Sequence, residues 1–132
     1  MTRRDKANSA VQLPTEAELD ILNILWAQGP STVRDVHTVI SKDTGYTTVL
    51  KQMQVMVEKG LLERSERFRS HVYEARVAKE QTQQRLARNL VQRAFDGSAK
   101  NLVLGALSAQ KVSSEELAEI REMLDRFEKG SL

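Results

Sequence analysis

The stretch GYTTVLKQMQVM, residues 45–56, predicts a helix with one apolar side and a polar leading end. Val49, Met53 and Met56 recur at helical intervals, so we expect them to face a core. The residues that would not fill that core are mostly small or polar: Tyr46, Thr47, Thr48, Lys51 and Gln54. Because a polar stripe is most often a solvated helix face, the surrounding sequence must decide whether this one meets a partner.

Two helices are predicted before it. In LPTEAELDILNILWAQGP, residues 13–30, Thr15 and Glu18 match a capping box, and Gly29 ends the helix. Its broad apolar face consists of Leu19, Leu22, Ile24, Leu25 and Trp26. In STVRDVHTVISKD, residues 31–43, Ser31 is the predicted cap. The apolar stripe of that second helix consists of Val33, Val36, Val39 and Ile40.

After a predicted stop at Gly60, the segment LLERSERFRSHVYEARV, residues 61–77, alternates with a period of two. This alternation predicts a β-hairpin, in which His71, Tyr73, Ala75 and Val77 share one side. The turn is placed near Phe68 to Ser70, although it lacks the Asn-Gly or Asp-Gly pair that marks many tight hairpins. Three helices followed by a hairpin form a winged helix-turn-helix.

From Lys79 the period is helical again in three segments, the last opening with Ser113 and Glu116 as a second capping box. The predicted fold is mainly α with a small β-hairpin. A flexible tail is expected at residues 1–12, a winged helix domain at 13–78 and a C-terminal three-helix dimerisation domain at 79–132.

The C-terminal helices carry more apolar surface than about fifty residues can cover alone, which favours a homodimer. The alternative is that this stripe packs within one chain, as most apolar helix stripes do. The predicted dimer contacts are Leu102, Val103, Leu107, Leu117, Ile120, Leu124 and Phe127.

In a helix-turn-helix the last helix enters the major groove of DNA with its N-terminal end. Thr48 can bond bases or phosphate through its hydroxyl, and Lys51 can reach guanine or phosphate. The predicted base-reading residues are therefore Tyr46, Thr47, Thr48, Lys51 and Gln54. The predicted contacts of the wing and backbone are Arg34, Lys42, Arg64, Arg67, Arg69 and His71. The competing hypothesis is a helical protein-interaction module that does not bind DNA.

Composition excludes several other functions. The 132 residues carry a net charge of only +2, so any electrostatic role must be local. With no cysteine there is no thiolate metal site or thiol nucleophile, and no stretch has the roughly 20 apolar residues of a membrane span. His37 and Asp35 point to different helix faces and form no catalytic or metal pair. We therefore predict a cytoplasmic protein that is not an enzyme and needs no metal or cofactor.

The segments LPTEAELDILNILWAQGPSTVRDVH, GYTTVLKQMQVMVEKGLLER and HVYEARV resemble the penicillinase repressor (BlaI/MecI-type) family of bacterial transcriptional repressors. The likeness extends to FDGSAKNLVLGAL and SSEELAEIREMLDRFEKG, which resemble that family's dimerisation helices. The resemblance implies a homodimer that presents two recognition helices to a palindromic operator with TACA and TGTA half-sites.

The chain also departs from the family. In the β-lactam-responsive members, repression is relieved by cleavage of an Asn-Phe bond, and Gly105 and Ala106 stand at the matching position here. Copper-responsive relatives use C-terminal cysteines, which this chain lacks. The resemblance therefore leaves the inducing signal, the target genes and any sensor or protease unidentified.

Overall fold

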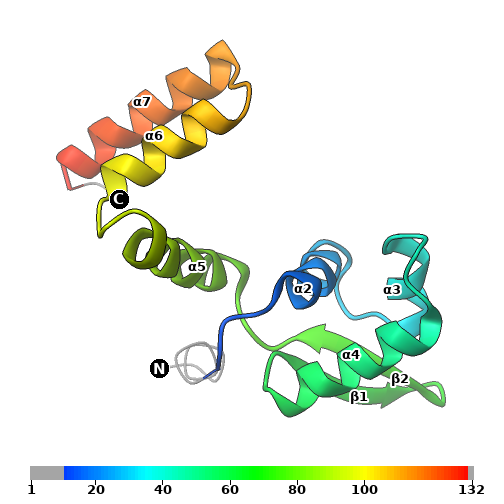
Figure 1. Cartoon of the computed structure of the whole chain (residues 1–132). Helices are drawn as coiled ribbons and strands as arrows, with labels where there is room; N and C mark the ends of the chain where they lie inside the picture. Colours follow the sequence, from blue (N-terminus) through cyan, green and yellow to red (C-terminus); the bar gives the residue numbers. More distant parts are fainter. Residues whose placement is uncertain (1–10, 131–132) are drawn as a thin grey trace. The chain divides into compact units, whose positions relative to one another are not determined.

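The computed structural model describes residues 11–130, which form helices and one antiparallel hairpin (Figure 1). One compact unit ends at Ala87 and a second begins at Arg88. The predicted division at residues 78 and 79 stays a prediction, because a compact unit is not by itself an independently folding domain. Residues 1–10, most of the predicted flexible tail, lie outside the described residues.

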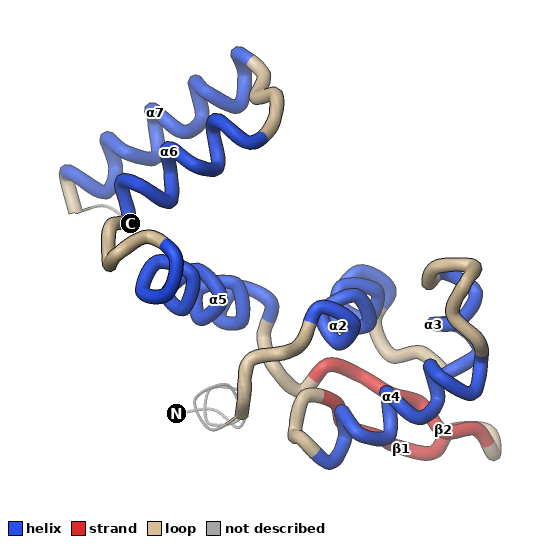
Figure 2. The backbone as a smooth tube through the Cα atoms, viewed as in Figure 1, coloured by secondary structure: helices blue, strands red, loops and turns tan. Residues whose placement is uncertain are grey.

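The first unit has the predicted order of three helices and a hairpin. The helices are α2 (Glu16–Gln28), α3 (Val33–Val39) and α4 (Tyr46–Glu58), followed by β1 (Leu62–Arg67) and β2 (Ser70–Ala75). Figure 2 shows the hairpin lying alongside α4, with α2 and α3 completing the unit. The prediction of a mainly α fold with a small β-hairpin is confirmed.

The core of this unit forms where the apolar sides of these elements meet. Val49, Met53 and Met56 of α4 are all 0 % exposed, as their helical spacing predicts. They pack with Ile21, Leu22 and Leu25 of α2 and with Tyr73 and Ala75 of β2. Full burial of one such aliphatic side chain contributes about 1.5–3 kcal/mol, so this cluster is the main source of stability in the unit.

The prediction that Ser31 caps the second helix was wrong. Thr32 is the N-cap of α3, and it forms a reciprocal capping box with Asp35. Ser31 is instead buried and pairs with Tyr73, exchanging two backbone hydrogen bonds of 2.9 and 2.8 Å. Helix α3 ends at Val39, which is 52 % exposed and so does not belong to the predicted apolar stripe.

The hairpin is confirmed, but its turn is shorter than predicted. Arg67 pairs with Ser70, so Phe68 and Arg69 alone connect the strands. Farther along, Arg64 lies opposite Tyr73 and Leu62 opposite Ala75. Paired residues share one face of a hairpin, and this face is buried at its Leu62 and Ala75 end and exposed towards the turn.

Helix α5 (Lys79–Ala94) contains the boundary between the units and is followed by α6 (Ala99–Ala109) and α7 (Ser114–Glu128). Ser113 caps α7 through its hydroxyl, which accepts a hydrogen bond from the Glu116 N–H. The predicted return bond from the Glu116 side chain does not form. Gly105 of α6 lies against the Phe95 ring, which a Cβ at this position would approach to 3.3 Å. No helix within residues 11–130 is long and apolar enough to cross a membrane.

Candidate nucleic-acid interface

The outward face of α4 is exposed along its first three turns. All five predicted base-reading residues are exposed: Tyr46, Thr47, Thr48, Lys51 and Gln54. The N-cap Gly45 offers no side chain to the leading N–H groups, and the first turn contains no acidic residue. Free N–H groups and the positive end of the helix dipole favour an anion at this end.

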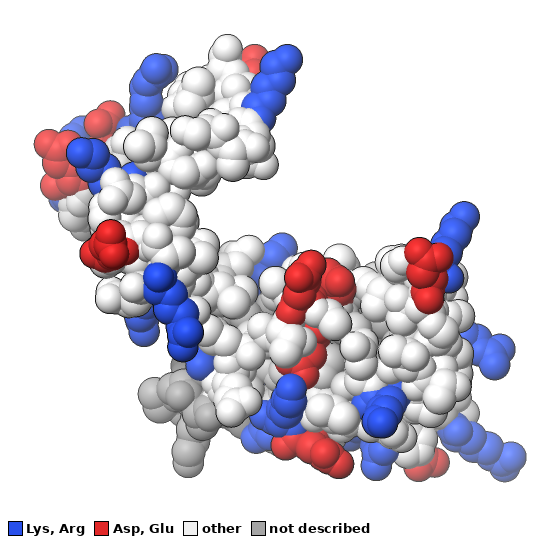
Figure 3. All heavy atoms as spheres, viewed as in Figure 1, with Lys and Arg blue, Asp and Glu red and all other residues white. Residues whose placement is uncertain are grey.

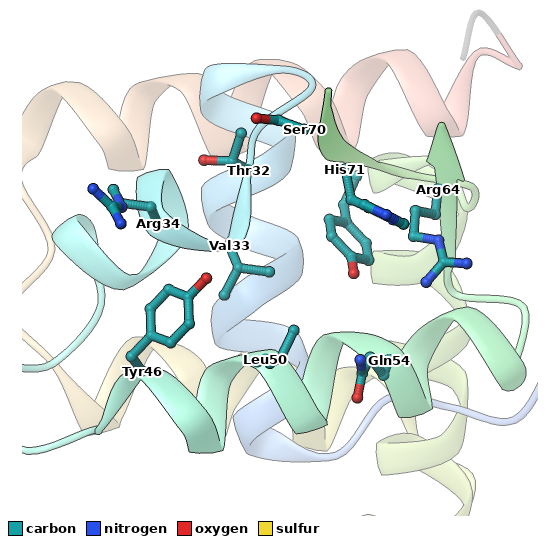
Figure 4. Close-up of a pocket in the computed structure, with 10 residues that line it drawn as sticks. Thr32, Val33, Arg34, Tyr46, Leu50, Gln54, Arg64, Ser70 and His71 are labelled. Atoms are coloured by element: carbon teal, nitrogen blue, oxygen red, sulfur yellow. The ribbon is translucent and has the colours of Figure 1, made fainter. Parts of the chain in front are cut away.

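One flank of α4 faces the hairpin across a hollow of about 580 Å³ (Figure 4). Tyr46, Leu50 and Gln54, spaced four residues apart, form the α4 side of this hollow. Figure 4 shows Arg64 and His71 entering it from the hairpin and Arg34 lying near Tyr46 at the other end. The complete lining is Thr32, Val33, Arg34, Tyr46, Leu50, Gln54, Arg64, Ser70, His71 and Tyr73.

The charged side chains that line this hollow are all basic. Two arginines and a histidine line it, and no Asp or Glu does. The hydroxyls of Thr32, Tyr46 and Ser70 add further hydrogen-bond donors. Guanidinium and hydroxyl groups around a space without carboxylates suit an anionic oxygen such as a phosphate. Thr32 and Ser70 were not among the predicted contacts, because only the fold brings them to this hollow.

The leading end of α4 is positioned by α3. Nε2 of His37 lies 3.0 Å from the Thr44 carbonyl oxygen, and its ring meets Tyr46 edge-on with 5.8 Å between ring centroids. His37 therefore has a structural role beside the entrance of α4. Among the described residues no group of His, Asp or Glu side chains is arranged to hold a metal ion.

The trailing end of α4 is held to α2 by an ion pair. Nζ of Lys59 donates a 2.7 Å hydrogen bond to Glu18, whose side chain is only 7 % exposed. Burial raises the pKa of Glu18. The hydrogen bond and charge of Lys59, together with the hydrogen bonds to Thr15, lower this pKa by more than burial raises it, so it lies below the ordinary value. This pair borders a second hollow, where Thr47, Thr48 and Lys51 form the other flank of α4.

The hairpin tip carries the remaining predicted wing residues. Arg67 and Arg69 are exposed and lie outside the hollow, as does Lys42 in the loop before α4. Lys and Arg side chains project around this end of the unit in Figure 3. Between the two arginines stands Phe68, whose side chain is 100 % exposed. Phe68 was not among the predicted contacts, although an aromatic residue in a hairpin turn was a signal in the sequence.

Comparison with known proteins gives the same assignment as the fold. The profile of the penicillinase repressor family matches residues 14–126. The chain belongs to the penicillinase repressor family. It is 21% identical to the penicillinase repressor of Staphylococcus aureus over 125 residues, 93% of this chain and 98% of the relative. It is also 21% identical to the methicillin resistance regulatory protein MecI of Staphylococcus aureus strain N315, over 85% of this chain and 93% of the relative.

A third relative, the penicillinase repressor of Bacillus licheniformis, is 21% identical over 84% of this chain and 88% of its own length. These relatives are named as bacterial repressors and regulators, not as enzymes. Membership in the repressor family thus supports a role in repressing transcription, and the names of these relatives suggest no enzymatic activity. At this level of identity, the contacts of individual side chains do not carry over from the relatives.

The family match extends to residue 126 and so includes every predicted dimer contact except Phe127. Val103, Leu124 and Phe127 are 44, 57 and 65 % exposed within one chain. The other four predicted contacts are half-buried: Leu102, Leu107, Leu117 and Ile120. Gly105 and Ala106, which stand where the resemblance places the Asn-Phe cleavage pair, lie in the middle of α6.

Proposed function

We propose that this chain is a sequence-specific repressor that binds a palindromic DNA operator as a homodimer. The observation that carries the proposal is the surface made by α4 and the hairpin. An exposed polar helix face borders a hollow with Arg34, Arg64 and His71 and no carboxylate in its lining. Such a surface suits the major groove, because its helix can approach base edges while the basic groups hold phosphates.

The roles of individual side chains follow from their places. Thr47, Thr48, Lys51 and Gln54 lie on the outward face of α4, where they would meet base edges. Arg34, Arg64 and His71 line the hollow and would hold backbone phosphate, together with the Tyr46 hydroxyl. Arg67, Arg69 and Lys42 lie outside it and would contact phosphates farther along the duplex.

The homodimer is proposed from the exposed apolar side chains of α6 and α7. Isolated large apolar residues on a surface are ordinary, but a row of them along neighbouring helices favours an interface. A symmetric dimer would present two copies of α4, and paired half-sites on the DNA would match that two-fold symmetry.

Selection of duplexes from a random-sequence pool by the full chain tests this function. We expect a palindrome to be enriched and to bind at least about a thousandfold more tightly than random duplex. Its affinity should fall steeply as salt is raised, because phosphate contacts release counterions. Absence of any duplex binding at low salt would contradict the proposal and favour the protein-interaction module.

A further inference from the structure

The turn of the hairpin uses residues that its backbone disfavours. Phe68 and Arg69 both have positive φ, 51° and 64°, which is the pattern of a two-residue turn normally built from Asn and Gly. A phenylalanine in this left-handed region is strained, because its Cβ crowds the backbone. Turn chemistry therefore does not account for Phe68, and strain of this kind is concentrated at functional sites.

Packing does not account for Phe68 either. Its side chain is 100 % exposed, whereas the next most exposed large apolar residue of the first unit, Val39, is 52 % exposed. The phenyl ring projects into solvent at the very tip of the hairpin. No other residue of the described first unit covers this ring, so a binding partner would give it the burial that the unit does not.

The charges beside the ring indicate the chemistry of that partner. Arg67 and Arg69 flank Phe68, and within the described residues neither side chain has an ion pair. The nearest acid in the strands, Glu66, lies opposite His71, while Glu63 and Glu74 oppose each other at the far end of the hairpin. An apolar ring between two free arginines suits a partner with anionic borders and an apolar interior, such as stacked bases between two phosphate backbones.

The reach of the hairpin suits the same partner. Of the residues that line the hollow beside α4, Ser70 is nearest the tip, two residues from Phe68. At about 3.3 Å per residue, the tip extends at most roughly 7 Å beyond the hollow. The major groove is about 12 Å wide, so a helix centred in it leaves the bordering backbone beside the hollow and the adjacent minor groove beside the tip.

Resting on the proposed DNA binding, we propose that Phe68 is an apolar wedge that the hairpin tip inserts into the minor groove beside each half-site. Arg67 and Arg69 hold the phosphates on either side of the ring. The ring partly unstacks one base step and bends the duplex. Flexible pyrimidine–purine steps cost least to open, so the wedge gives the protein a sequence preference outside the bases that α4 reads.

The test compares Phe68→Asn, which suits the turn but removes the ring, with Phe68→Leu, which keeps an apolar wedge. Both full-length variants are titrated against the duplex selected by the unaltered chain. We expect Phe68→Asn to weaken binding about tenfold, the scale of one lost base-stacking contact, and Phe68→Leu to restore most of the affinity. The salt slope should not change, since no charge is removed.

Two further measurements separate a wedge from a structural role. Dyes at the ends of the duplex should report a bend with the unaltered protein and a smaller one with Phe68→Asn, and 2-aminopurine at the flanking step should brighten only when the ring is present. Thermal unfolding of Phe68→Asn should occur at a higher temperature, because Asn tolerates the left-handed conformation. Weaker binding by a more stable protein cannot result from damage to the hairpin.

The outcomes distinguish the wedge from the function on which it rests. If the unaltered chain selects a duplex but Phe68→Asn binds and bends it equally well, the wedge is wrong while the repressor function stands. If Phe68→Asn lowers the oligomeric state seen in sedimentation, Phe68 is a protein contact and the wedge is again wrong. If no duplex is bound by any variant, both proposals fail.

Discussion

The two compact units of the chain differ in how far their apolar side chains are buried. In the first, thirteen hydrophobic residues are buried, and they come from every helix and strand between α2 and β2. In the second, no residue between 88 and 130 is buried, although α6 and α7 both carry several large apolar residues. The first unit thus covers its own apolar surface, while the second leaves apolar surface exposed, which is the basis of the proposed homodimer.

The two units also differ in what their exposed surfaces can do. Because the core of the first unit is complete, the outward side of α4 contributes nothing to it and is free to contact a ligand. Stability and recognition then depend on different residues within the same helix. In the second unit the exposed apolar residues would serve folding and assembly together, so a single change there should affect both.

The largest effect should follow from placing a charge in the proposed dimer contact. Leu124→Asp would leave an unpaired carboxylate in an apolar interface, at a cost of several kcal/mol, and should yield monomers. In a dimer the two copies of the first unit bind both half-sites as one event, so separating them should weaken operator binding by about a hundredfold or more. Sedimentation and binding titrations measure both effects, and thermal unfolding should show the first unit intact.

Ala118→Asp provides the matched control, because it adds the same charge on the exposed opposite side of α7. It should leave the dimer and the operator affinity unchanged. A Leu124→Asp variant that stays dimeric at micromolar concentration would show that the second unit covers its own apolar face, and the contrast between the units would be wrong.

On the first unit, substitution of the outward side of α4 should affect binding but not folding. Thr48→Ala and Lys51→Ala should each weaken operator binding by about 1–3 kcal/mol, the value of a specific base contact, with unchanged unfolding temperatures. Both side chains are exposed and contribute nothing to the core. Lys100→Ala, at an exposed lysine of α6, controls for the loss of a positive charge. Equal affinities in all three variants would exclude this helix from the groove.

Sequence patterns predicted α4 well because its signals are local. Gly45 and Gly60 flank it, and Val49, Met53 and Met56 mark its buried side at helical spacing. The start of α3 was missed because Ser31 and Thr32 are adjacent residues that both favour caps. The distant pairing of Ser31 with Tyr73 places Thr32 at the cap, and no local pattern contains that information.

The sequence predicted which side chains of α4 are exposed, but not how the residues of the candidate site are arranged. Exposure of Tyr46, Thr48 and Lys51 followed from helical spacing, since all three fall off the apolar side. The hollow did not, because it joins the start of α3, one flank of α4 and the hairpin. The Glu18–Lys59 pair likewise joins residues 41 positions apart.

The Glu18–Lys59 ion pair provides a third test, with a smaller expected effect, of whether the first unit is stabilised by its own contacts alone. Glu18→Gln keeps an oxygen to accept the bond from the Thr15 N–H but removes the charge facing Lys59. Since Lys59 is partly exposed and screened by water, we expect a loss of about 1–2 kcal/mol in the free energy of unfolding. The dimer should be unaffected, because both residues belong to the first unit.

The pH dependence of this effect has a definite sign. The pKa of Glu18 is lower in the folded protein than its ordinary value of about 4.5, so the unfolded chain binds its proton more readily. The ion pair therefore stabilises the fold above pH 4.5, and this contribution is lost as the pH falls through the lower folded pKa. Denaturant unfolding at pH 7 and at a series of pH values below 4.5 should show the difference between the two proteins shrinking as the pH falls. A difference that stays constant across this series would mean that packing, not charge, explains the loss.

The smallest effects should come from the two arginines of the hairpin tip, and they sharpen the contrast with α4. Arg67→Ala and Arg69→Ala should each reduce affinity by about 1 kcal/mol at 0.1 M salt, equally for the selected and random duplexes, because a phosphate contact releases about one counterion regardless of sequence. Each should lower the slope of log affinity against log salt by about one. Arg121→Ala, at an exposed arginine of α7, should leave that slope unchanged. If an arginine variant weakens binding only to the selected duplex, the arginines read bases, and recognition extends from α4 into the wing.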